Sequence, residues 1–235
     1  MTDREIDEVL REAAQTPHEV NPALLERIAK SIQSSLQPVR PLPSTCVLTM
    51  GLVLICAAVA SAGAALAGFY GFEKMDLLDR GLIFASLAVL ACVVGVEFVS
   101  EMIPGSRRWT SPGVLLLISS AVLLGLFASL FPDYRTTQFF SAGLVCLVIG
   151  LAHAIPAALL SWLVLRRGFA VNSVSAGLAA GTLGGLAGVG MLELHCPNFQ
   201  ATHILVWHTA VLLVASGVGA FAGWLVRFPA RFSRL

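Results

Sequence analysis

The residues best suited to chemistry surround a cysteine near the end of the fifth long apolar run. Cys196 follows Glu193 and His195, and His203 and His208 come within the next twelve residues. Thiolate, imidazole and carboxylate groups are ligands for zinc or copper. The spacing is irregular, however, and residues five apart lie on different faces of a regular α-helix. We therefore expect a capped, packed loop, with His195, His203 and His208 kept as alternative metal ligands.

The sequence lacks the common signatures of catalysis. It contains no H-E-x-x-H, G-x-S-x-G, P-loop or C-x-x-C pattern. Cys46, Cys56 and Cys92 fall inside apolar runs, where a cysteine serves as a small apolar residue. We therefore expect no enzyme activity, no catalytic residue, no cofactor and no bound metal.

The composition indicates that membrane-spanning helices position these residues. Hydrophobic residues make up 57% of the 235 residues and charged residues only 12%, and the mean hydropathy is +0.82. A net charge of +1 provides no overall field for nucleic acid, so no direct nucleic-acid contact is expected. Runs of about 20 apolar residues span a bilayer as helices. Six such runs cover residues 46–69, 81–99, 113–131, 139–165, 173–192 and 204–226.

These runs predict an all-α integral membrane protein with six transmembrane helices and a short helical N-terminal cytoplasmic tail. Six spans put both termini on one side of the lipid bilayer. Twelve Lys and Arg residues then lie on the side of the termini and only three on the other. By the positive-inside rule, we expect both termini to be cytoplasmic. The expected regions are the tail at 1–45, the bundle at 46–226 and a C-terminal tail at 227–235.

This topology brings two cysteines to the outer half of the bundle. Cys146 lies about 10 Å below the outer end of the fourth span, at 1.5 Å per helical residue. Cys196 lies in the last outer loop. Because the outer side of a bacterial inner membrane is oxidising, a disulfide between them is a hypothesis.

The tail has the pattern of two short helices, at 2–15 and 21–36. In the second helix, Leu25, Ile28, Ile32 and Leu36 share one face. Helices this short are marginal alone, so the stripe needs a partner. Docking in a protein groove is favoured. Packing on the bundle, binding to the membrane surface and self-association are the alternatives.

The fifth span is rich in glycine at four-residue spacing, as at Gly177, Gly181 and Gly185. Such spacing favours close helix packing. A substrate path along the glycines, as in a small-molecule carrier or channel, is the alternative. Buried polar groups are few: we expect Glu97 to reach the membrane surface, and His153 to bond a backbone carbonyl freed by Pro156.

The C-terminal half resembles a known family. The resemblance rests on Cys146, Arg166-Arg167-Gly168, the run 177–181, Leu194-His195-Cys196-Pro197, Trp207-His208 and residues 225–228. These features resemble NrsF-like proteins, six-span inner-membrane negative regulators of extracytoplasmic-function (ECF) sigma factors. The tail is longer and more helical than is usual in that family, and His208 stands where tyrosine is more usual.

The resemblance implies a membrane-bound anti-sigma factor whose partners are an ECF sigma factor and the bilayer. The sigma factor would be held by the tail, through Leu25, Ile28, Ile32 and Leu36, and released on a membrane or periplasmic signal. Cys146 and Cys196 would be the redox or sensing residues. The alternatives are a carrier or channel, and a redox or metal-handling membrane protein.

Overall fold

The structure is a computed structural model that divides the chain into two units. It describes residues 7–8, 11, 22–35, 43–103, 105–106, 109–165, 168, 170 and 172–227. The first unit is Met1–Leu42 and the second Pro43–Leu235. The division falls three residues before the expected end of the tail.

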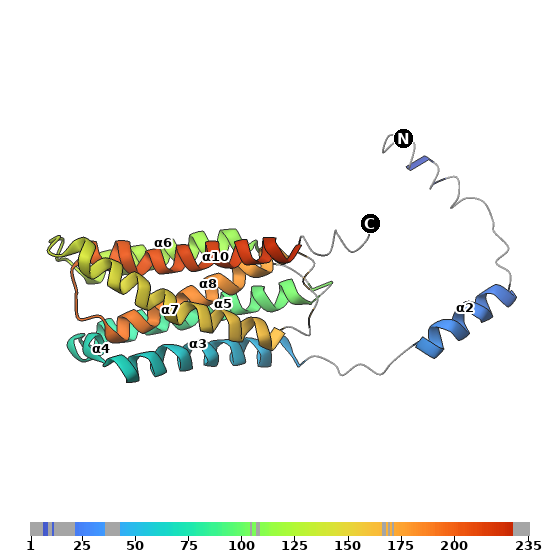
Figure 1. The fold of residues 1–235 in the computed structure, drawn as a ribbon, viewed down its shortest axis with the longest axis horizontal. Helices are drawn as coiled ribbons and strands as arrows, with labels where there is room; N and C mark the ends of the chain where they lie inside the picture. Colours follow the sequence, from blue (N-terminus) through green and yellow to red (C-terminus); the bar gives the residue numbers. More distant parts are fainter. Residues whose placement is uncertain are drawn as a thin grey trace. The chain divides into compact units, whose positions relative to one another are not determined.

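The second unit is a helical bundle (Figure 1). Six of its helical segments are long and apolar enough to cross a membrane, which confirms the fold class expected from the sequence. The elements of the bundle are α3 (Thr45–Ala67), α4 (Tyr70–Lys74), α5 (Leu77–Met102), α6 (Pro112–Leu130), α7 (Phe139–Leu165), α8 (Ser173–His195), α9 (Ala201–His203), the π-helix η1 (Ile204–His208) and α10 (Thr209–Arg227).

Short polar side chains begin four of the long helices. Ser44, Asp76 and Ser111 each accept a hydrogen bond from a backbone N–H in the first turn of α3, α5 and α6. Asn172 accepts two such bonds, from Val174 and Ser175, at the start of α8. These caps satisfy N–H groups that lack a partner within the helix, which matters most beside lipid.

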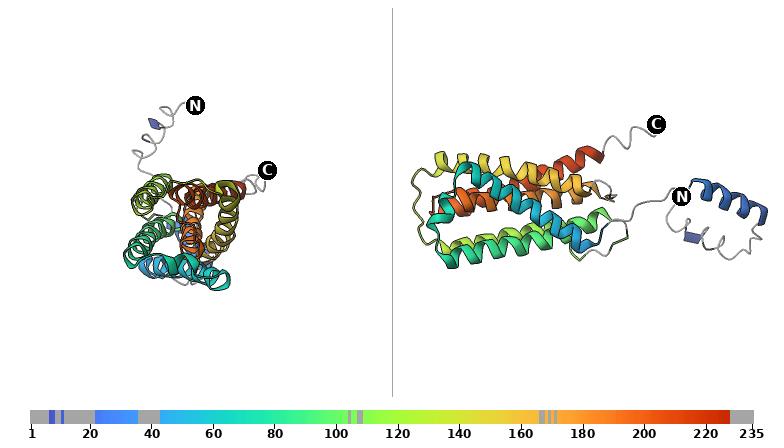
Figure 2. Two further views of the ribbon diagram at one scale, coloured as in Figure 1. Left: turned by 90° about the vertical axis from the view of Figure 1, so that its left-hand side faces the viewer. Right: turned by 90° about the horizontal axis from the view of Figure 1, so that it is seen from below.

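Helix α8 forms the centre of the bundle. The view along the bundle in Figure 2 shows it enclosed by the other long helices. Of its most apolar 18-residue stretch, 83% is buried, against 28–50% for the other five spans. A helix buried on every side has to be narrow, because its neighbours approach from all directions.

The glycines of α8 allow this close approach. A Cβ added at Gly177 would lie 2.2 Å from the carbonyl oxygen of Gly219 in α10, and one at Gly181 would lie 2.4 Å from that of Ala215. On another side of α8, a Cβ at Gly188 would lie 2.5 Å from the oxygen of Gly150 in α7. The glycine spacing therefore serves helix packing, as the sequence favoured.

The two polar groups singled out in the spans lie differently from expectation. Glu97 does not reach the surface: only 2% of it is exposed, and Glu101 one turn later is also buried. His153 bonds a backbone carbonyl, but its Nδ1 lies 2.8 Å from the oxygen of Ile149. The carbonyl that Pro156 leaves without its helical donor is that of residue 152, so the proline does not supply this acceptor.

The described part of the tail contains α2 (Pro22–Ser35). Pro22 opens this helix, as expected for a proline at the first helical position. Leu25, Ile28 and Ile32 are about half exposed, at 52%, 46% and 53%. Leu36 lies outside the described residues, as does most of the first expected helix, of which residues 7, 8 and 11 are helical.

Candidate functional site

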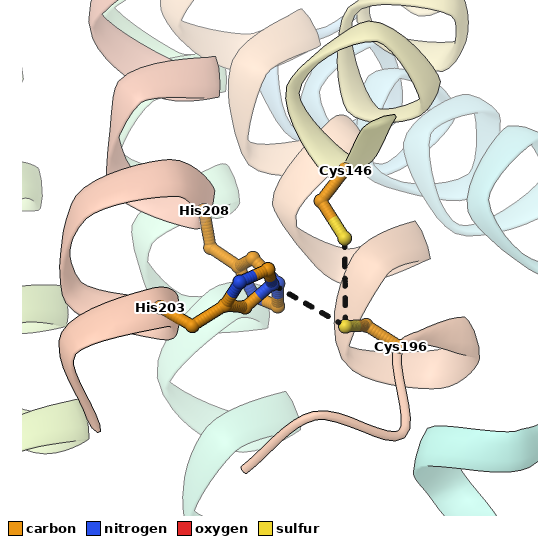
Figure 3. Close-up of side chains that lie close together, drawn as sticks. All are labelled: Cys146, Cys196, His203 and His208. Atoms are coloured by element: carbon orange, nitrogen blue, oxygen red, sulfur yellow. Dashed lines mark hydrogen bonds between the residues drawn. The ribbon is translucent and has the colours of Figure 1, made fainter. Parts of the chain in front are cut away.

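The end of α8 lies at the end of the bundle opposite the start of α3 (Figure 1), and a group of cysteine and histidine side chains gathers beside it. Cys146 comes from α7, Cys196 follows the last residue of α8, His203 ends α9 and His208 ends η1. Figure 3 shows all four pointing toward one another. One donor atom from each lies within 4.8 Å of the others, and all four residues are buried. We call these four residues the donor cluster.

The two sulfur atoms of the cluster lie side by side. Cys146 Sγ and Cys196 Sγ are 3.5 Å apart, and both cysteines are free thiols. A disulfide bond would bring the sulfurs to about 2.05 Å. The hydrogen bond to Cys146, together with burial, raises the pKa of the Cys196 thiol above its usual value. The structure thus joins the two cysteines expected to sense a signal, while the disulfide between them stays a hypothesis.

A buried carboxylate orients one of the histidines. His208 Nδ1 lies 2.6 Å from Glu193 Oε1, and the side chains of both residues are 1% exposed. Among the described residues, His208 Nε2 has no nitrogen or oxygen partner, and the ring also interacts with the thiol of Cys196. The carboxylate therefore holds one ring nitrogen and leaves the other directed at the cluster.

The π-helix explains why both histidines reach the cluster. A regular α-helix, which is the backbone expected from the sequence, puts His203 and His208 on different faces. In η1 the backbone bonds from residue i to i+5, so residues five apart are brought toward the same side. His203 Nε2 lies 3.6 Å from Cys196 Sγ, and the two imidazole centroids are 5.4 Å apart. The expectation of different faces was wrong for this reason.

His195 does not join the cluster. Its Nδ1 lies 3.0 Å from the carbonyl oxygen of Gly68, and its ring packs on Tyr70. This contact fastens the end of α8 to the connection between α3 and α4. Of the three alternative metal ligands proposed from the sequence, the structure brings together His203 and His208 and separates His195.

The connections at this end of the bundle hold the cluster in place. The backbone N–H of Ala201 donates to the carbonyl of Asp133, at 2.6 Å, and the hydroxyl of Thr202 donates to the carbonyl of Arg135. Asp133 and Arg135 form an ion pair with each other, at 2.7 Å. The segment between α6 and α7 thus fixes the start of α9, and with it His203.

A pocket of about 690 Å³ opens beside the cluster. Cys146, Cys196 and His203 line one part of it, and Lys74 and Asn198 are among the polar residues of its other walls. A small solute or ion can therefore approach the sulfur atoms without crossing the packed core.

A second pocket is the place where a carrier would hold its solute if the glycine-rich helices formed a substrate path. It holds about 300 Å³ between α7, α8 and α10 and is lined by small and apolar residues such as Ala180, Gly181 and Trp162. A carrier site usually includes buried polar groups that hold the solute. This groove offers no such set among its lining residues.

The comparisons with known proteins agree with the resemblance seen in the sequence. The model of the family described as "NrsF: Negative regulator of sigma F" matches residues 33–228. No curated protein and no solved structure matches the chain. The family match covers most of the chain, including all six spans and the donor cluster. This protein therefore belongs to the NrsF family of negative regulators of a sigma factor.

Proposed function

We propose that this protein is a membrane-bound anti-sigma factor that sequesters an ECF sigma factor through its N-terminal cytoplasmic helices. The family match supports a sigma factor as the partner. The observation that carries the tail's role is α2: it belongs to a separate unit and leaves Leu25, Ile28 and Ile32 half exposed. An apolar stripe on a short helix is a typical element for docking into a protein groove.

The contact with the sigma factor rests on the chemistry of α2 itself. The family match begins at residue 33, so most of this helix lies outside the matched range. Its apolar stripe would cover the surface through which the sigma factor binds core polymerase. A membrane or periplasmic signal then weakens the contact, and a tenfold release requires about 1.4 kcal/mol of differential binding.

Membrane co-fractionation tests the sequestration. Each ECF sigma factor of the same organism is expressed with an epitope tag, with and without the full-length chain. We expect one of them to move from the soluble to the membrane fraction only when the chain is present. If every sigma factor stays soluble in both cases, the proposal is wrong.

The proposal also requires both termini in the cytoplasm of a bacterial inner membrane. The distribution of Lys and Arg supports this orientation. Green fluorescent protein fused after residue 235 should fluoresce, and alkaline phosphatase fused after residue 136 should be active, because each reporter works on one side of the membrane only. Active phosphatase fused at residue 1 would contradict the orientation.

A further inference from the structure

The donor cluster combines features that a packed loop does not require. Cys146, Cys196, His203 and His208 come from four separate elements, and all are at least 91% buried. Buried polar groups are normally hydrogen-bonded. Here His208 Nε2 has no nitrogen or oxygen partner among the described residues, and its ring interacts with the thiol of Cys196 instead. An imidazole nitrogen that faces thiols and no oxygen acceptor is suited to a ligand that binds nitrogen and sulfur together.

We propose that the donor cluster binds one thiophilic divalent cation of the zinc class. Two thiolates and two imidazoles form one of the usual tetrahedral zinc sites. With zinc–sulfur bonds of about 2.3 Å, two sulfurs on a tetrahedral ion lie about 3.8 Å apart. The sulfur atoms of Cys146 and Cys196 are already 3.5 Å apart. A shift of a few tenths of an ångström would therefore suffice for this pair.

Glu193 completes the arrangement as an orienting residue. Metal-binding histidines usually donate their second ring N–H to a carboxylate or carbonyl, which fixes the tautomer. The Glu193–His208 contact has this form, with Nδ1 on the carboxylate and Nε2 left for the cation.

The binding step conserves charge and oxidation state. The S–H bonds of Cys146 and Cys196 break, two sulfur–metal bonds form, and the two protons pass to water. Two histidine nitrogens donate lone pairs, and no atom is oxidised or reduced. The pocket beside Cys146 and Cys196 supplies the route for the cation and for the released protons. Magnesium and calcium prefer oxygen ligands, so they should not compete.

Zinc content measured on the full-length protein tests this inference. The protein is purified in detergent with a phosphine reductant, stripped with a chelator, and equilibrated with zinc sulfate. We expect one zinc per chain in the wild type and almost none in Cys146→Ser. Cys92→Ser and His195→Gln are matched controls outside the cluster, and each should retain one zinc. Wild type without zinc, or Cys146→Ser with a full complement, would overturn the inference.

Alkylation of the wild type gives a measurement that does not depend on the folding of any variant. With zinc, Cys146 and Cys196 should react more slowly than with magnesium, whereas Cys92 should react equally in both. Equal reaction of the two cluster thiols with either metal would contradict the inference. A disulfide in protein purified without reductant, followed by no zinc uptake after reduction, would also overturn it.

Removing the carboxylate charge of Glu193 should have a smaller effect on zinc binding than removing a donor atom. Glu193→Gln keeps all four donor atoms but removes the charge that orients His208. The affinity for zinc should fall by about 10- to 100-fold, while one zinc per chain still binds at saturation. The zinc site does not depend on the proposed sequestration, because these measurements contain no sigma factor.

Discussion

The double substitution Ile28→Asp with Ile32→Asp should release the sigma factor and raise transcription from its target promoters. Both side chains lie on the exposed stripe of α2. Burying one isoleucine contributes about 1.5–3 kcal/mol, so replacing two with buried carboxylates should cost at least about 3 kcal/mol. Since each 1.4 kcal/mol is about a factor of ten, the affinity should fall at least about a hundredfold. A promoter reporter and membrane co-purification of the sigma factor measure the effect.

The opposite face of α2 provides a control of equal charge. Arg27→Gln with Lys30→Gln also lowers the net charge by two, but these residues lie about half a turn away from the stripe. This variant should leave reporter output and co-purification unchanged. If both doubles release the sigma factor alike, charge and not the apolar stripe controls binding. If neither does, the tail is not the docking element.

The spans could be predicted well because the signal is repeated over many residues. A helix in lipid has to satisfy its backbone internally and cover its length with apolar side chains, so each span shows about 20 apolar positions. The boundaries of the expected spans differ from the helices by at most a few residues, as for 173–192 against Ser173–His195. The helix extends beyond the apolar run because its last residues include Glu193 and His195, which are polar but paired. Glu193 contacts the side chain of His208, and His195 bonds the backbone carbonyl of Gly68.

The donor cluster was harder to predict because one backbone irregularity decides it. The residue types around Cys196 indicated metal chemistry, but an α-helical period separates His203 from His208. The π-helix changes that period, and the sequence 204–208 carries no pattern that signals it. Glu97 illustrates the same difficulty: position near a span end favours a surface carboxylate, and only the packing of α5 shows that it faces inward.

The role of the glycines in helix packing can be tested by adding a single methyl group to α10, either on the side that faces α8 or on another side. A Cβ at Gly219 would lie 2.2 Å from the backbone oxygen of Gly177 and 2.9 Å from Cα of Gly181, whereas at Gly217 nothing lies within 4 Å. Backbone atoms cannot rotate away, so Gly219→Ala has to push α10 from α8.

Overpacking of this kind costs about 1–3 kcal/mol. We therefore expect Gly219→Ala to unfold in detergent at a clearly lower temperature, followed as loss of the monodisperse peak in size exclusion, and Gly219→Leu to fail to assemble. Gly217→Ala should match or slightly exceed the wild type, because alanine favours a helix over glycine by about 1 kcal/mol. Both variants gain that preference, so any difference between them measures the α8–α10 contact alone. Equal stability of the two alanine variants would mean that the close approach of these helices does not support the bundle.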